Sequence, residues 1–180
     1  MHDAQREAVC GRGQVSGVFV GIAAAETARF TEFWESVFVG ASGASEVRVE
    51  RGGNLAQNRN RLTERFLKSE REWLWYVDDD QVFLPGTLQQ LLAHGKAVVS
   101  GLYVSRNYPF LPLVYGAARE DGRAQLKELR PDQGGLTQVG AVGAGCLLVH
   151  RAVIKTLTPP YWTIGQVAPD ALKRFVIDGG

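Results

Sequence analysis

Runs of continuous apolar residues alternate along the chain with segments whose apolar residues recur at helical spacing. The runs VSGVFVGIAAA (15–25), WLWYV (73–77) and KAVVSGLYVSR predict strands buried on both faces, because aliphatic and aromatic residues follow one another without polar interruption. After the first run, apolar residues return at i, i+3, i+4, i+7 and i+8, which predicts an amphipathic helix. Its expected buried face comprises Phe30, Phe33, Trp34, Val37 and Phe38.

A second helix is predicted to begin after Asn54. Asn54 is a suitable N-cap, and Gln57 stands three residues later, where a capping box requires a glutamine or glutamate. Leu55, Leu62 and Phe66 mark the expected buried stripe of this helix. The helix precedes the 73–77 strand, so strand and helix alternate here.

The remaining segments extend this alternation. EVRVE (46–50) alternates polar and apolar residues, as a half-exposed strand does, and LPGTLQQLLAHG reads as a short helix. Residues 117–133 are polar and predict a hairpin or excursion, while residues 136–157 predict a strand, a glycine-rich turn, a second strand and a short helix. The order favours an α/β fold with a mostly parallel, helix-covered sheet and a late antiparallel addition.

Length and composition are those of one soluble domain. The chain has 180 residues, of which 45% are hydrophobic and 22% charged. We predict a flexible N-terminal tail over residues 1–14 and a single domain over residues 15–180. Twenty basic residues against 19 acidic ones give a net charge of +1, which predicts neither nucleic-acid binding nor attraction to an anionic membrane. With no long apolar segment and two scattered cysteines, Cys10 and Cys146, we expect a cytoplasmic protein without a membrane span.

Three consecutive acids, Asp78, Asp79 and Asp80, end the 73–77 strand. Crowded carboxylates repel one another unless water or a cation compensates them. One interpretation is a solvated turn that leads into the helix after Pro85. The other is a ligand site, because ligands of open α/β sheets bind beyond the carboxyl ends of the strands. The buried strand before the acids favours the site, and in an extended segment Asp78 and Asp80 would point the same way and Asp79 the opposite way.

Four segments together resemble the GT-A glycosyltransferases, and most closely the family-2-like members of bacteria and phages. They are NLAQNRNRL, YVDDDQVFLPGTLQQLL, VSGLYVSRNYPFLPLVYG and VGAGCLLVHRAVI, within a similarity that extends from Val15 to about Trp162. In that family a hydrophobic strand ends in an Asp-x-Asp motif. The motif binds the ribose of a sugar nucleotide and, through a divalent metal, its diphosphate. The resemblance therefore implies a Rossmann-like GT-A fold that binds a nucleotide-diphosphate sugar.

The resemblance also implies roles for individual residues. Asp78 and Asp79 would contact the nucleotide, and Asp80 with Asp78 would hold Mn²⁺ or Mg²⁺, cations that prefer hard oxygen ligands. Arg59 and Asn60, early in the second helix, would contact the nucleotide, since a helix N-terminus and an arginine both attract anions. Two further candidates follow the first strand, where the family places the nucleotide base: Ala23 and Glu26.

Further residues bear on the sugar and acceptor sites. Gly143 and Gly145 either let the backbone approach a sugar or provide a turn conformation. Tyr108 and Phe110 would offer a hydroxyl acceptor a stacking face. His150, alone beside an arginine, is interpreted as structural. The loop after the first strand, GIAAAET, lacks a G-x-G-x-x-G phosphate cradle, which argues against a dinucleotide oxidoreductase.

An inverting transferase also needs a carboxylate to deprotonate the acceptor hydroxyl. Members of the family usually supply it from an acidic pair after the glycine-rich strand, and no such pair follows Trp162. Asp170 is the candidate base, with a helix N-cap as its alternative role. Two functions are therefore expected to compete: a metal-dependent glycosyltransferase acting on a hydroxyl acceptor, and a catalytically impaired nucleotide-sugar-binding or assembly module on the same fold.

Overall fold

A computed structural model describes residues 17–24, 31–105, 108–120, 123–128 and 135–163, with side chains omitted for 117–128. The predicted tail over residues 1–14 lies outside this part of the chain. The described elements, in chain order, are β1 (Val18–Ala23), α1 (Thr31–Gly40), β2 (Glu46–Glu50), α2 (Leu55–Lys68), β3 (Trp73–Asp78), α3 (Thr87–Ala93), β4 (Val98–Ser100), β5 (Val114–Glu120), β6 (Arg123–Glu128), β7 (Ala141–Val142), β8 (Cys146–His150) and α4 (Arg151–Ile154).

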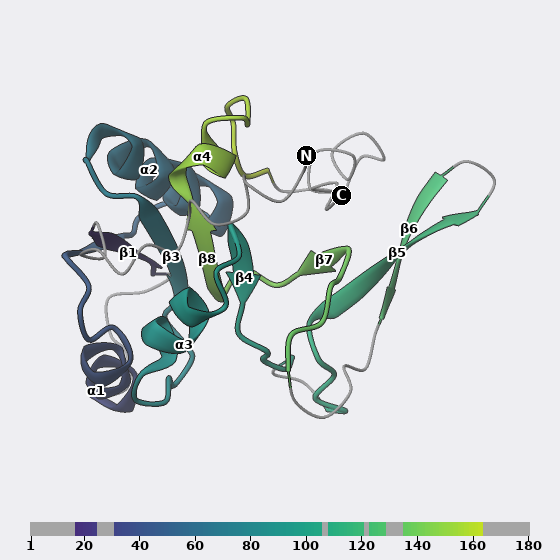
Figure 1. Ribbon diagram of the computed structural model, residues 1–180, viewed down its shortest axis with the longest axis horizontal. Helices are drawn as coiled ribbons and strands as arrows, with labels where there is room; N and C mark the ends of the chain where they lie inside the picture. Colours follow the sequence, from purple (N-terminus) through teal and green to yellow (C-terminus); the bar gives the residue numbers. More distant parts are fainter. Residues whose placement is uncertain (1–16, 25–30, 106–107, 121–122, 129–134, 164–180) are drawn as a thin grey trace, which may run out of the picture.

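The central sheet has five strands in the order β2-β1-β3-β8-β4 (Figure 1). β1 pairs in parallel with β2 and with β3, whereas β8 runs antiparallel to both β3 and β4. The predicted α/β fold with a mostly parallel sheet is therefore confirmed. The late antiparallel strand is confirmed as well, although it lies inside the sheet and not at its edge.

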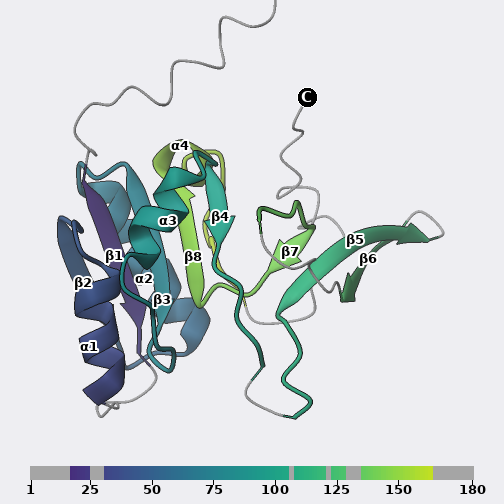
Figure 2. The ribbon, with the colours of Figure 1, turned by 60° about the horizontal axis from the view of Figure 1, so that its bottom comes forward.

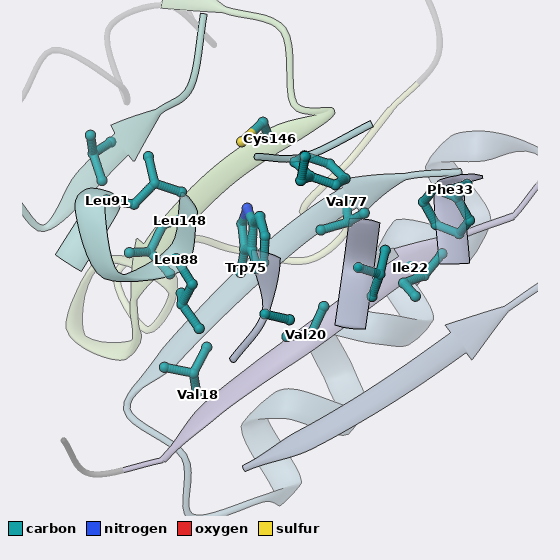
Figure 3. Close-up of a cluster of buried hydrophobic side chains, with 14 residues drawn as sticks. Val18, Val20, Ile22, Phe33, Trp75, Val77, Leu88, Leu91, Cys146 and Leu148 are labelled. Carbon is teal, nitrogen blue, oxygen red and sulfur yellow. The ribbon is translucent and has the colours of Figure 1, made fainter. Parts of the chain in front are cut away.

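Helices cover both faces of the central sheet, and each face has its own hydrophobic core. On one face, alternate residues of β1 and β3, among them Val20 and Trp75, pack against Phe33 of α1 and Leu88 of α3 (Figure 3). On the other face, the residues between them pack against α2 and α4, including Leu62 and Phe66 of α2 and Ile154 of α4. The strands predicted from residues 15–25 and 73–77 are thus buried on both sides, as predicted. The third predicted strand, KAVVSGLYVSR, is wrong in this respect: it forms only the three-residue edge strand β4, in which Val99 is buried, while Leu102 and Val104 beyond it are exposed.

A second, three-stranded antiparallel sheet has the order β6-β5-β7. Its long β5–β6 hairpin projects away from the central sheet in both ribbon views (Figures 1 and 2). The hairpin confirms the excursion predicted for residues 117–133. β7 pairs with β5 and leads directly into the glycine-rich turn before β8, so the second sheet joins the central one at that turn.

The buried faces of the first two helices were predicted only in part. In α1, Phe33 and Val37 are buried as expected, but Trp34 is 38% exposed and Phe38 80% exposed. Phe30 lies outside the described residues. Leu55 of α2 is also 47% exposed, because it stands at the first helical position, where it lines a small cavity instead of packing on the sheet.

The capping box of α2 is confirmed. The Asn54 side chain accepts a hydrogen bond from the Gln57 amide at 2.9 Å, and the Gln57 side chain accepts one from the Asn54 amide at 3.0 Å. In the described part of the chain, no helix is long and apolar enough to cross a membrane.

Candidate functional site

The carboxyl ends of β1 and β3 lie side by side and carry the predicted site residues. Ala23 is the register partner of Asp78, so the last residues of the two strands are adjacent. The next residue, Ala24, donates its amide to the Glu50 carbonyl at the end of β2. Three parallel strands therefore end together, which is the edge where ligands of open α/β sheets bind.

An ion pair between Arg59 and Asp78 occupies this edge. Asp78 follows Leu74 and Tyr76 at alternate positions of β3, so its side chain lies on the face that α2 covers. Arg59, in the second turn of α2, reaches it with an Nη2–Oδ1 distance of 2.6 Å. The arginine is 8% exposed, and its Nε has no hydrogen-bond partner among the described residues. The structure thus brings two predicted nucleotide-binding residues together and leaves one buried donor unused.

Asn58, which the sequence analysis did not single out, is the second buried polar residue here. It is 1% exposed and donates its amide to the carbonyls of Ala24 (3.1 Å) and Gly53 (3.2 Å), tying α2 to the end of β1. Its Oδ1 has no partner within the described structure. The residue also lines a cavity of about 140 Å³ together with Ala24, Gly53, Asn54 and Leu55. The sequence signal for Asn58 was its position, an asparagine one turn inside a capped helix.

The Asp triplet does not continue as a strand. β3 ends at Asp78, and Asp79 and Asp80 form a turn, so the predicted alternation of all three side chains is wrong. The two residues differ in environment, because Asp79 is 4% exposed and Asp80 is exposed. The physical reason is that the chain must leave the sheet here to reach α3, and a turn replaces the extended backbone that alternation requires.

Two carboxylates near this turn are the donors that a divalent cation would find here. Asp78 and Asp80 provide carboxylate oxygens, which Mg²⁺ and Mn²⁺ prefer. Within the described residues, three or more His, Cys, Asp or Glu side chains do not gather into a metal site of their own. A cation held by Asp78 and Asp80 would therefore complete its coordination with phosphate oxygens and water.

Close packing leaves little room for a side chain at the two glycines before β8. A Cβ on Gly143 would overlap the Tyr103 hydroxyl and lie 2.7 Å from its Cζ. A Cβ on Gly145 would lie 2.9 Å from Asp78 Oδ2 and would overlap the Gln81 amide. The Tyr103 hydroxyl accepts a hydrogen bond from the Gly145 amide at 2.8 Å, and burial raises the pKa of that hydroxyl. Neither glycine has a positive φ, so the turn-conformation interpretation is wrong, and protein side chains occupy the space beside both.

Asn60, a predicted nucleotide contact, faces the chain itself. Its side chain bonds the backbone of Trp162, donating to the carbonyl at 2.8 Å and accepting from the amide at 3.0 Å.

His150 is a helix cap, since its Nδ1 accepts from the Ala152 amide at 3.2 Å, in agreement with its structural interpretation. Tyr108 and Phe110 are exposed and lie edge to face, 6.1 Å apart. Glu26 and Asp170 lie outside the described residues.

Comparisons with known proteins support the fold and go no further. No protein-family model matches the chain, and no curated protein matches it. Among solved structures, the crystal structure of A197 from STIV is similar, with a TM-score of 0.63 and 18% sequence identity. The similarity covers 87% of this chain and 76% of A197. The chain therefore shares its α/β fold with A197.

Proposed function

We propose that this chain is a metal-dependent glycosyltransferase with a GT-A, Rossmann-like fold. It would move a sugar from a nucleotide-diphosphate donor to a hydroxyl acceptor. The observation that carries the proposal is the Arg59–Asp78 pair, which lies at the carboxyl ends of parallel strands and is followed directly by Asp80. A guanidinium and two carboxylates at such an edge match what a diphosphate with its cation needs.

Three features beside the pair support the same proposal. The cavity lined by Ala24 and Asn58 is adjacent to Arg59 along α2, and it would take part of the nucleoside. The Oδ1 of Asn58, which has no partner among the described residues, would accept an N–H from that ligand, because a buried acceptor without a partner costs free energy. The unpartnered Nε of Arg59 would donate to a phosphate oxygen.

Under this proposal different residues bind the cation, the diphosphate and the nucleoside. Asp78 and Asp80 would hold the Mn²⁺ or Mg²⁺ ion, which supplies electrostatic stabilisation of the leaving diphosphate. Arg59 would bind the same diphosphate from the side of α2, where the helix N-terminus also favours negative charge. Ala23 and Ala24, with small side chains, would leave room for the nucleoside beside β1.

Calorimetric titration of UDP and GDP, with and without Mn²⁺, tests the proposal. We expect one of the nucleotides to bind in a Mn²⁺-dependent way. Asp80→Ala and Asp78→Asn should each weaken that binding at least tenfold, or about 1.4 kcal/mol. Glu35→Ala, which removes an exposed carboxylate from α1, is the matched control and should bind as the wild type does. Binding that is unchanged in Asp80→Ala, or absent from the folded wild type, would refute the proposal.

The alternative, a nucleotide-sugar-binding or assembly module without turnover, rests on the sequence after Trp162, which lacks an acidic pair. It predicts the same nucleotide titration but no reaction. The two functions separate when sugar nucleotides are incubated with the chain and Mn²⁺. Release of the nucleoside diphosphate supports the transferase, with Asp170→Asn testing the candidate base, whereas binding without release supports the module.

A further inference from the structure

Trp162 lies against α2 although about a hundred residues separate the two in the sequence. The side chain of Asn60 holds the Trp162 backbone through two hydrogen bonds, one donated to the carbonyl and one accepted from the amide. The pair of bonds satisfies both polar groups of one residue in a segment without regular structure. The position of the indole ring is therefore fixed relative to the helix that carries Arg59.

The ring lies beneath the guanidinium of Arg59. The Arg59 Cζ is 4.9 Å from the ring centroid, within the range of a cation–π contact. The indole also meets the ring of Tyr76 edge to face, with the ring centroids 5.1 Å apart. Arg59 is thus held in two ways, by Asp78 at its nitrogen and by Trp162 across its face.

A chain of hydrogen bonds links the indole back to the arginine. Trp162 Nε1 donates to the Tyr76 hydroxyl at 3.3 Å, and that hydroxyl lies 2.6 Å from Thr63 Oγ1. Thr63 Oγ1 donates to the backbone carbonyl of Arg59 at 2.7 Å. Because the Thr63 hydroxyl donates its proton to the Arg59 carbonyl, the Tyr76 hydroxyl must donate to Thr63. Each of the three donors in this series of hydrogen bonds therefore has a partner.

We propose that Trp162 is a positioning residue, which holds the Arg59 guanidinium in place and thereby sets the affinity for a nucleoside diphosphate. The inference rests on the proposed function. An arginine side chain loses rotamer freedom when it binds a ligand, and a ring that already restricts it reduces that loss. Trp162 acts through Arg59 and need not touch the ligand.

A double-mutant cycle on nucleotide affinity tests the inference. Titration of UDP or GDP in the presence of Mn²⁺ compares the wild type with Trp162→Ala, Arg59→Ala and the double variant. We expect Trp162→Ala to weaken binding roughly 2- to 12-fold, which corresponds to the cost of immobilising one flexible side chain on binding. In the Arg59→Ala background, the same substitution should have no further effect, because Trp162 then has nothing to position.

Three further variants separate positioning from folding. Trp162→Phe keeps a ring beneath Arg59 and should restore binding to within about threefold of the wild type. Trp34→Ala, which removes an indole from α1 on the opposite face of the sheet, is the matched control and should bind normally. Should Trp162→Ala fail to fold, Asn60→Ala carries the same cycle, because it releases the Trp162 backbone and leaves the ring intact.

The outcomes distinguish this inference from the proposed function. Wild-type binding together with additive effects of Trp162→Ala and Arg59→Ala, or with no effect of Trp162→Ala, overturns the inference and leaves the proposed function standing. A folded wild type that binds neither nucleotide refutes the proposed function, and the inference falls with it.

Discussion

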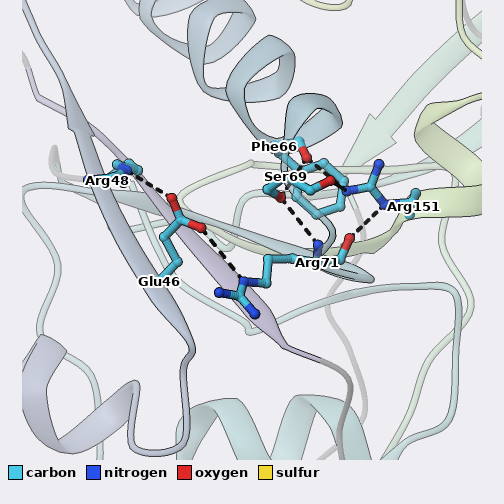
Figure 4. Close-up of polar contacts among 6 residues, drawn as sticks. All are labelled: Glu46, Arg48, Phe66, Ser69, Arg71 and Arg151. Carbon is cyan, nitrogen blue, oxygen red and sulfur yellow. Dashed lines mark hydrogen bonds and ion pairs between the residues drawn. The ribbon is translucent and has the colours of Figure 1, made fainter.

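Arg151, the first residue of α4, closes the C-terminal end of α2, and its removal provides a quantitative test of the fold. Its guanidinium donates to the carbonyls of Arg71 and Ser69 at 2.6 Å each, Phe66 at 2.8 Å and Leu67 at 3.2 Å. The same group lies over the Phe66 ring, with Cζ 4.5 Å from the centroid (Figure 4). The last carbonyls of a helix have no partner within the helix, so an arginine from a neighbouring element supplies one.

The cost of Arg151→Met follows from these contacts. The two shortest bonds contribute about 1.5 kcal/mol each, the lower value for a charged donor, because the carbonyls regain water when the arginine is removed. The Phe66 carbonyl already accepts from the Ser69 amide and hydroxyl, so its loss adds little. The stacking on Phe66 contributes about 0.5–1 kcal/mol. Arg151→Met should therefore lower the free energy of unfolding by about 4 kcal/mol, a large part of the stability of a typical domain.

Urea-induced unfolding, followed by circular dichroism, measures this change. Arg151→Lys should lose about half as much, because an ammonium group cannot bridge carbonyls on both sides as a guanidinium does. Arg61→Met is the control, since exposed Arg61 makes a single 3.4 Å bond among the described residues, to the Arg51 carbonyl. It should change the free energy of unfolding by less than about 0.5 kcal/mol. A loss below about 1 kcal/mol for Arg151→Met would refute the argument.

Two further predictions concern groups near the candidate site. Burial raises the pKa of Tyr76 to about 12 from an unfolded value near 10, so its stabilising contribution is complete below pH 10 and disappears as the pH rises through 12. Across that window the wild type should lose roughly 2–3 kcal/mol more unfolding free energy than Tyr76→Phe, and parallel pH profiles of the two would contradict this. Gly143→Ala should lower stability by about 1–3 kcal/mol, because its Cβ displaces the Tyr103 hydroxyl. A double variant with Tyr103→Phe should lose less than the two single variants together, as thermal unfolding can show.

Local patterns in the sequence were sufficient to predict the cap of α2 and the strand β3. The capping box of Asn54 and Gln57 depends on residues three positions apart, and the structure contains it as predicted. β3 was predicted from its continuous apolar residues because burial on both faces leaves no polar alternation. In both cases the information lies within a few residues of the element itself.

Contacts between distant segments were not predictable in the same way. The spacing in α1 predicted one apolar stripe, yet the helix meets the sheet through Phe33 and Val37 and leaves Phe38 exposed, which depends on the angle of packing. The docking of Trp162 on α2 depends on the path of the chain after α4. The Arg59–Asp78 pair is an intermediate case. The alternation of side chains along a strand placed Asp78 on one face of the sheet, but the sequence did not show which helix covers that face.

β8 lies between β3 and β4, and this position sets the order in which the chain can mature as the ribosome makes it. β1, β2 and β3 can pair as soon as β3 has been synthesised, since they are consecutive along the chain and adjacent in the sheet. The free edge of β3 must then wait for Cys146–His150, while the second sheet and β4 are made. Until β8 pairs with it, the edge of β3 is an open apolar strand edge, the kind of edge at which nascent chains aggregate.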